Sequence, residues 1–173
     1  MAERPKQLAH LEYLGDATKF AGQMHALIPK CVLLENFSAA EVQLLAHFMD
    51  VYRCEVASEI IREGDGGDFM LMVLEGTVEV HKRDRWNTQQ LLASVDAGRT
   101  LGEMSMIDGA PRFATCIAAG ATLIAVLHRE SLARIRLGRA TRPVLTGCPP
   151  RPGTARRAGR GAAGWWRAAA ATA

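Results

Sequence analysis

The segment from Leu101 to Thr115 contains the residues whose types and spacing could do chemistry. Gly102 lets the backbone turn tightly beside a ligand, and the residues from Glu103 to Ile107 can form one helical turn whose amides point outward. A proline then stiffens the exit and is followed by Arg112, nine residues after the glutamate. A guanidinium binds a phosphate diester through two hydrogen bonds, whereas a carboxylate accepts a hydrogen bond from a sugar hydroxyl. The spacing therefore predicts a small pocket for a sugar phosphate.

This order of residues, Leu-Gly-Glu, a short helix and Pro-Arg-Phe-Ala-Thr, closely resembles the phosphate-binding cassette of cyclic nucleotide-binding domains. That family includes protein kinase A regulatory subunits, catabolite activator proteins and cyclic nucleotide-gated channels. The resemblance implies that Glu103 holds the ribose 2′-hydroxyl and that Arg112 holds the cyclic phosphate. The expected site also includes, before and after the arginine, Gly102, Met104, Ser105, Phe113, Ala114 and Thr115. The alternative, a surface Glu and Arg on an ordinary strand connection, is disfavoured because the match extends to the flanking strands.

Phe113 occupies the position that distinguishes the two common bases in the family. There, a Thr or Ser supplies a hydroxyl that favours guanine, and an Ala accompanies adenine. The resemblance therefore implies cyclic AMP as the ligand rather than cyclic GMP, because phenylalanine offers no hydroxyl. Its bulk could also obstruct the base or stack on it. A further alternative is that the ring points into the barrel and changes nothing.

Helical signals dominate the first fifty residues. Apolar residues between Lys6 and Ile28 recur at roughly helical spacing and predict one or two N-terminal helices, which family members often pack beside the barrel. Ser38 and Glu41 then have the spacing of a capping box, which predicts a helix over 39–50.

From Val51 onward, short β-rich runs are separated by glycines. The clearest strands are Phe69 to Glu75, which is apolar, and Thr77 to His81, which alternates after a turn at Gly76. The resemblance covers about Leu33 to Ile135, with Ser58 replacing a usual glycine. The expected fold is mainly β with flanking helices, a double-stranded β-helix (jelly-roll) of about eight strands.

Three parts are expected along the 173 residues: an N-terminal helical segment (1–32), a cyclic nucleotide-binding domain (33–135) and a basic tail rich in Ala, Arg, Gly and Pro (136–173). Up to Ala133 there are 12 Lys and Arg against 18 Asp and Glu, whereas Arg134 to Ala173 contains nine Arg and no acid. Two interpretations of the tail stand side by side, a natively disordered segment and an ending replaced by a frameshift.

Several classes of site find no support in the sequence. There is no nucleophile elbow, P-loop or paired-carboxylate signature, so we expect no enzyme, and no cofactor beyond the nucleotide ligand. Neither the histidines nor the cysteines have metal-ligand spacing, and we expect the cysteines to be reduced. These residues are His10, His25, His47, His81, His128, Cys31, Cys54, Cys116 and Cys148. The sequence has no apolar run of eighteen residues and no signal-peptide core, so we expect a cytoplasmic protein without membrane contact.

The expected function is a sensory and regulatory module of signal transduction that binds a cyclic nucleotide and changes its contacts with a second copy or an effector protein. One alternative is a transcription regulator of the catabolite-activator type. Specific DNA binding is not expected of this chain, because no DNA-binding domain follows residue 135. The other alternative is an interaction domain that keeps the fold but binds no nucleotide.

Overall fold

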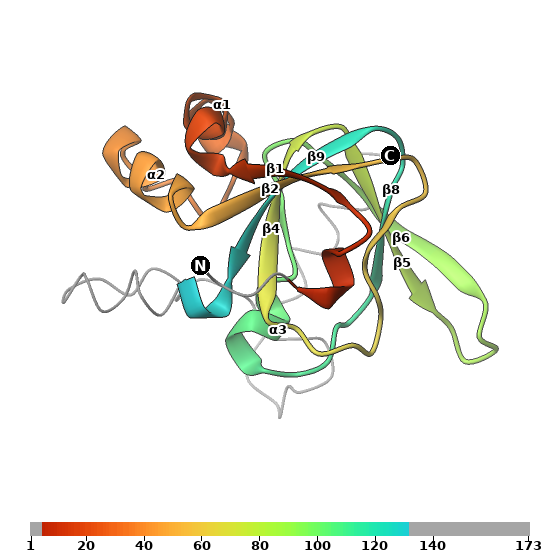
Figure 1. Cartoon of the computed structure of the whole chain (residues 1–173). Coiled ribbons are helices and arrows are strands. Elements are labelled where there is room, and N and C mark those ends of the chain that lie inside the picture. The colour runs from red at the N-terminus through yellow and green to blue at the C-terminus, as the bar shows by residue number, and fades with distance from the viewer. Residues whose placement is uncertain (1–4, 132–173) are drawn as a thin grey trace. The chain divides into compact units, whose positions relative to one another are not determined.

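Nine strands in two antiparallel sheets form the framework of the computed structural model, which describes residues 5–131 (Figure 1). The first sheet runs in the order β1 (Glu12–Asp16), β2 (Met49–Cys54), β9 (Thr122–His128), β4 (Phe69–Glu75) and β7 (Thr100–Leu101). The second runs in the order β3 (Glu59–Ile61), β8 (Thr115–Ala118), β5 (Thr77–Arg83) and β6 (Gln89–Asp96). The prediction of a mainly β fold with flanking helices is therefore confirmed. The basic tail predicted over 136–173 lies outside the described residues.

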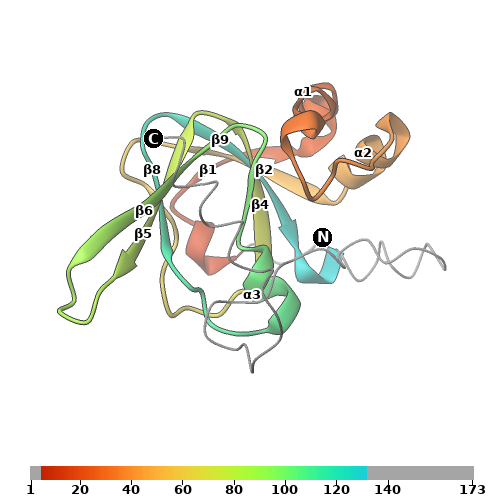
Figure 2. The same ribbon diagram turned by 180° about the vertical axis from the view of Figure 1, so that it is seen from behind.

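The helices are short and lie at the ends of the sheets. Figures 1 and 2 both show α1 (Ala21–Leu27) beside α2 (Ala39–Ala46) at one end, and α3 (Glu103–Asp108) away from them. The remaining turns of helix are of the 3-10 type: η1 (Lys6–Leu8), η2 (Ala17–Phe20) and η3 (Ile28–Lys30). Helices α1 and α2 lie between β1 and β2, whereas α3 joins β7 to β8. That connection carries the residues that the sequence singles out.

The core lies between the two sheets and draws side chains from both. Strand β4 is buried at every position except Glu75, and β9 is buried along its whole length. The shared cluster includes Phe69, Leu71, Val78 and Ile124. Burying an apolar side chain of this size contributes about 1.5–3 kcal/mol. Cys54 and Cys116 are free thiols in this core, and burial raises the pKa of each to about 12.

The N-terminal segment differs from its prediction. Helical spacing between Lys6 and Ile28 predicted one or two helices, but Glu12–Asp16 forms β1 and pairs with β2. Gly15 lies where the register between β1 and β2 shifts. Its backbone has a φ of +111°, which is incompatible with an α-helix. Leu8 and Leu11 pack into the core between the sheets, so the apolar spacing reflects a turn followed by a strand. Helix α1 confirms the helical prediction over Ala21–Leu27 only.

The capped helix begins as predicted but ends earlier. Ser38 Oγ accepts from the Glu41 amide at 3.4 Å, and the Ser38 amide donates to the Glu41 carboxylate at 2.8 Å, which completes the capping box. The predicted end at Asp50 is wrong, because Met49 and Asp50 start β2 and pair with Leu127 and Val126. Sheet pairing there overrides local helical preference.

Replacing Ser38 with alanine should lower the free energy of unfolding by about 1 kcal/mol, because the Glu41 amide at the start of α2 loses the hydroxyl that caps it. Urea unfolding measures this as a lower midpoint with an unchanged slope. Ser94→Ala, at an exposed position of β6, is the control and should change the midpoint much less. Equal midpoints for the parent and Ser38→Ala would show that the cap contributes nothing.

Candidate functional site

Gly102 is the hinge between β7 and α3. Its backbone is left-handed at φ +83°, which favours glycine. A Cβ at this position would also lie 2.6 Å from Arg112 Nη1 and 3.2 Å from the Phe69 carbonyl oxygen. Any side chain at this position would displace the guanidinium. The glycine is therefore needed both for the turn and for the placement of Arg112.

Arg112 is the cation of the predicted site, and it is buried, with 3% of its surface exposed. Nη1 donates to the Gly102 carbonyl at 2.9 Å, and Nη2 donates to the Phe69 carbonyl at 2.7 Å. The guanidinium carbon lies 4.4 Å from the centre of the Phe69 ring. Nε is buried and has no hydrogen-bond partner. Burial lowers the pKa of Arg112 from its ordinary value, and the nearby charge of Asp68 partly opposes this.

The turn that follows β3 fixes the backbone of Arg112. The Gly64 amide donates to the Arg112 carbonyl at 2.9 Å, and the Arg112 amide donates to the Asp65 carbonyl at 2.8 Å. Gly67, in the same turn, lies so close that an added Cβ would be 2.3 Å from Ser105 Cβ and 3.0 Å from Arg112 Nε. The turn, α3 and the arginine are thus packed as one unit.

Gly67→Ala should destabilise the fold by about 1–3 kcal/mol, because the new methyl group must displace Ser105 or Arg112. Its neighbour Gly66 provides a matched control, since a Cβ there would meet nothing within 4 Å. Thermal unfolding should show a clearly lower midpoint for Gly67→Ala and little change for Gly66→Ala. Equal midpoints for the two variants would contradict the close packing of this turn.

Glu103 is the first residue of α3, and it is half-buried as a residue. Its Oε2 atom, however, has no solvent contact and no hydrogen-bond partner. Burial raises the pKa of the Glu103 carboxyl, and a hydrogen bond with its own backbone and the charge of Arg112 offset part of that rise. The first residue of α3 therefore contributes a buried acceptor without a partner, and the segment after α3 contributes a buried donor without a partner, Arg112 Nε.

The other predicted site residues divide into two groups. Ser105 is buried in α3, and its carbonyl accepts from Arg129; Met104 is partly buried beside it. Phe113 is half-buried, with its carbonyl held by Lys82 at 2.7 Å. Ala114 and Thr115 are buried at the start of β8, and the Thr115 hydroxyl accepts from the Glu63 amide at 3.1 Å. The structure thus brings Arg112 into contact with Gly102, places Ser105 and Arg112 together beside Gly67, and places Ala114 directly before β8 and Thr115 at its start.

Sequence reasoning missed Arg129, which closes the unit from the far end of β9. Its Nη2 donates to the carbonyls of Gly67 at 2.9 Å and Ser105 at 2.8 Å, and its amide donates to the Asp68 carbonyl at 2.7 Å. The only signal in the sequence was an arginine soon after the last predicted strand. Such an arginine is too common to indicate a contact with Gly67 or Ser105.

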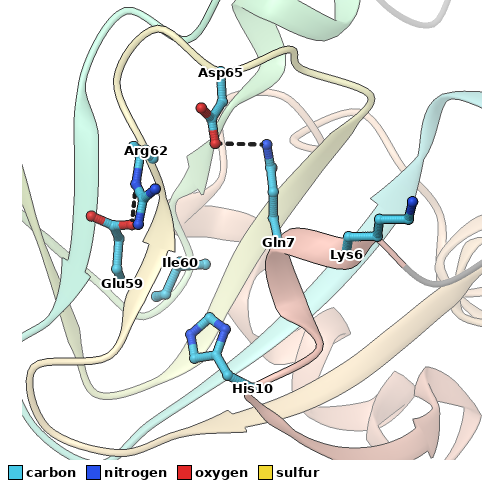
Figure 3. A pocket seen from close by; sticks show the side chains of 7 residues that line it. All are labelled: Lys6, Gln7, His10, Glu59, Ile60, Arg62 and Asp65. Atoms are coloured by element: carbon cyan, nitrogen blue, oxygen red, sulfur yellow. Dashed lines mark hydrogen bonds and ion pairs between the residues drawn. The ribbon is translucent and has the colours of Figure 1, made fainter.

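A separate cavity of about 380 Å³ lies beside the same turn (Figure 3). Its lining consists of Lys6, Gln7, His10, Glu59, Ile60, Arg62 and Asp65, none of them a predicted site residue. Figure 3 shows Gln7 reaching to Asp65, with Nε2 3.0 Å from Oδ2, and Arg62 paired with Glu59 at 2.7 Å. Asp65 belongs to both places, because it lines the cavity and its carbonyl accepts the Arg112 amide.

Within residues 5–131 no group of three or more His, Cys, Asp or Glu side chains could hold a metal ion. No helix in this described part of the chain is long and apolar enough to cross a membrane.

Known proteins resemble this chain in sequence and fold. The family model described as "Cyclic nucleotide-binding domain" matches residues 54–137. The solved cyclic nucleotide-binding domain from Methylobacillus flagellatus KT is 35% identical, with a TM-score of 0.71, and the match covers 79% of this chain and 80% of that chain. This chain belongs to the cyclic nucleotide-binding domain family. The jelly-roll prediction is confirmed with it, and the segment 101–115 is the part that resembles the family's cassette.

Longer relatives contain the domain as one part. The cAMP-dependent protein kinase regulatory subunit of Mucor circinelloides f. lusitanicus is 27% identical over 108 residues, which cover 62% of this chain and 25% of that protein. This chain therefore spans about a quarter of that relative's length. The regulatory domain of Toxoplasma gondii PKA, solved with cAMP, has the same fold at 22% identity and a TM-score of 0.62, over 68% of this chain and 44% of that one.

Proposed function

We propose that this cyclic nucleotide-binding domain binds cyclic AMP and acts as a sensory module in signal transduction. Arg112 binds the cyclic phosphate and Glu103 accepts a hydrogen bond from the ribose 2′-hydroxyl. The supporting observation is the pair of buried atoms without partners, the donor Arg112 Nε and the acceptor Glu103 Oε2. A buried polar atom without a partner costs about 1–3 kcal/mol, and a phosphate and a hydroxyl would satisfy these two.

The phosphate contact is supported by the shape of the surrounding backbone. Gly67 and Gly102 both lie so close to Arg112 that a side chain at either position would displace the guanidinium. Met104 and Ser105 lie in the first turn of α3, where the backbone amides point out of the end of the helix and could donate to a phosphate. The guanidinium is already oriented by two carbonyls, so little of its freedom remains to be lost on binding.

For the base, the absence of a hydroxyl on Phe113 favours cyclic AMP over cyclic GMP. The output is regulatory and not catalytic, and a protein effector receives it. The regulatory subunits among the relatives support this assignment. Free thiols at Cys31, Cys54 and Cys116 fit a reducing, cytoplasmic setting.

Thermal unfolding of the full chain tests this function. Cyclic AMP at 100 times its dissociation constant should stabilise the native state by about 2.7 kcal/mol, cyclic GMP should do so less, and plain AMP should do nothing. No shift with either cyclic nucleotide, in a chain that melts cooperatively, would refute the proposal. A larger shift with cyclic GMP would overturn the choice of base alone.

A further inference from the structure

Lys82, near the end of β5, forms an ion pair with Glu63 in the turn after β3. The Nζ atom lies 2.5 Å from Oε1, and the two side chains are 33% and 22% exposed. The pair of Arg53 and Glu12, by comparison, is 55% and 58% exposed. Because the Lys82 pair is partly shielded from water, it is worth more than a surface pair of similar geometry.

The position of Lys82 on β5 explains its burial. Side chains alternate along a strand, so Lys82 follows Val78 and Val80 on the face that packs against the core. A lysine on that face loses hydration and needs partners. The ammonium has three: the Glu63 carboxylate, the Phe113 carbonyl at 2.7 Å, and the Phe113 ring, whose centre is 4.5 Å away.

Glu63 holds the same segment from the opposite side. Its second carboxylate oxygen accepts the Arg83 amide at 3.0 Å, and its own amide donates to Thr115 Oγ1. The next residue, Gly64, donates to the Arg112 carbonyl. The nearby Lys82 ammonium and the Arg83 amide hold the pKa of Glu63 below its usual range, against a raising effect of burial. Lys82 therefore contacts this segment at the Phe113 carbonyl, Glu63 at the Thr115 hydroxyl and Gly64 at the Arg112 carbonyl. These contacts add to those that the Arg112 amide and guanidinium make.

We propose that Lys82 and Glu63 are positioning residues for the nucleotide site, which fix the Phe113 carbonyl and with it the segment next to Arg112 before the ligand arrives. The inference rests on the proposed function. Neither side chain needs to touch the nucleotide. Without the pair, the segment after Pro111 would sample more conformations, and binding would have to restrict it again. The lost preorganisation should weaken affinity roughly 3- to 10-fold.

A double-mutant cycle on the full chain tests this, with cyclic AMP affinity measured by titration calorimetry. Lys82→Met and Glu63→Gln should each weaken binding roughly 3- to 10-fold. The double variant should bind cyclic AMP only slightly more weakly than the single variant that has the lower affinity. Lys82→Arg should restore most of the affinity, because a guanidinium can reach both a carboxylate and a carbonyl.

Two controls separate positioning from general destabilisation. Arg53→Met removes the exposed pair between β1 and β2, and Ser38→Ala weakens the cap of α2; both should bind cyclic AMP like the parent. Two results would overturn the positioning role and leave the proposed function standing. In the first, Lys82→Met and Glu63→Gln bind cyclic AMP as tightly as a parent that binds it. In the second, Ser38→Ala loses as much affinity as those two variants. A parent that binds no cyclic nucleotide would overturn the proposed function and this inference together.

Discussion

Replacing Arg112 with alanine should weaken cyclic AMP binding by roughly 10- to 150-fold, the equivalent of about 1.5–3 kcal/mol for a charge-assisted hydrogen bond. The arginine is the only described residue that combines a buried position in the cassette with a donor atom left without a partner. Its loss would remove the positive charge that we propose to face the phosphate. Titration calorimetry of the parent and the variant measures the effect.

The same substitution should also destabilise the fold, because the Gly102 and Phe69 carbonyls lose their donors. Affinity must therefore be measured below the unfolding range of the variant. Arg112→Lys keeps the charge but not the two-carbonyl geometry, and should bind with intermediate affinity. Arg62→Ala removes an exposed arginine that pairs with Glu59, and should leave affinity unchanged. An Arg112→Ala variant that is folded and binds like Arg62→Ala would show that the phosphate lies elsewhere.

Replacing Glu103 with alanine should weaken cyclic AMP binding and abolish the preference for ribose over 2′-deoxyribose. A hydrogen bond to a charged acceptor is worth about 1.5–3 kcal/mol, so the parent should bind the 2′-deoxy analogue at least 10-fold more weakly than cyclic AMP. In Glu103→Ala the two ligands should bind alike. Competition titrations with both ligands measure this, and Glu55→Ala, at an exposed position between β2 and β3, is the control. A variant that still discriminates between the sugars would contradict the assignment of Glu103.

The raised pKa of Glu103 gives this contact a pH dependence. The 2′-hydroxyl donates to the ionised carboxylate, so affinity should fall as the pH drops through the pKa of Glu103, above the range of an ordinary glutamate. The stability of the ligand-free chain runs the other way. A carboxyl whose native pKa is raised contributes stability below its unfolded pKa, and that contribution is lost as the pH rises through the native value. Glu103→Gln should therefore not lower the unfolding midpoint at neutral pH, although it weakens binding.

Local signals in the sequence were sufficient for the parts of the fold that depend on neighbouring residues. The capping box of Ser38 and Glu41 has its partners three residues apart, and β4 is apolar from Phe69 to Leu74. The contact between Gly102 and Arg112 also lies within one short segment, and the family resemblance outlined it. These features could be read in advance because each is determined by a few adjacent residues.

Features that depend on distant pairing could not be read in this way. Residues 12–16 carry apolar spacing that suits a helix, and only pairing with β2, some forty residues later, makes them a strand. Arg112 reaches the carbonyl of Phe69 across 43 residues, and Lys82 reaches the carbonyl of Phe113 across 31. Arg129 likewise meets Gly67 and Ser105 only after the sheet has formed. The sequence identifies the residues that we propose to face the ligand, but not the ones that hold them in place.

A crystal structure of the full chain with cyclic AMP would show where the nucleotide lies. We expect a phosphate oxygen within about 2.7–3.2 Å of Arg112 Nε, and the ribose 2′-hydroxyl at the same kind of distance from Glu103 Oε2. Both atoms are then satisfied by one ligand, with Lys82 still paired to Glu63. A nucleotide bound elsewhere, such as in the cavity beside Gln7, with Arg112 Nε and Glu103 Oε2 still without partners, would contradict the proposed site.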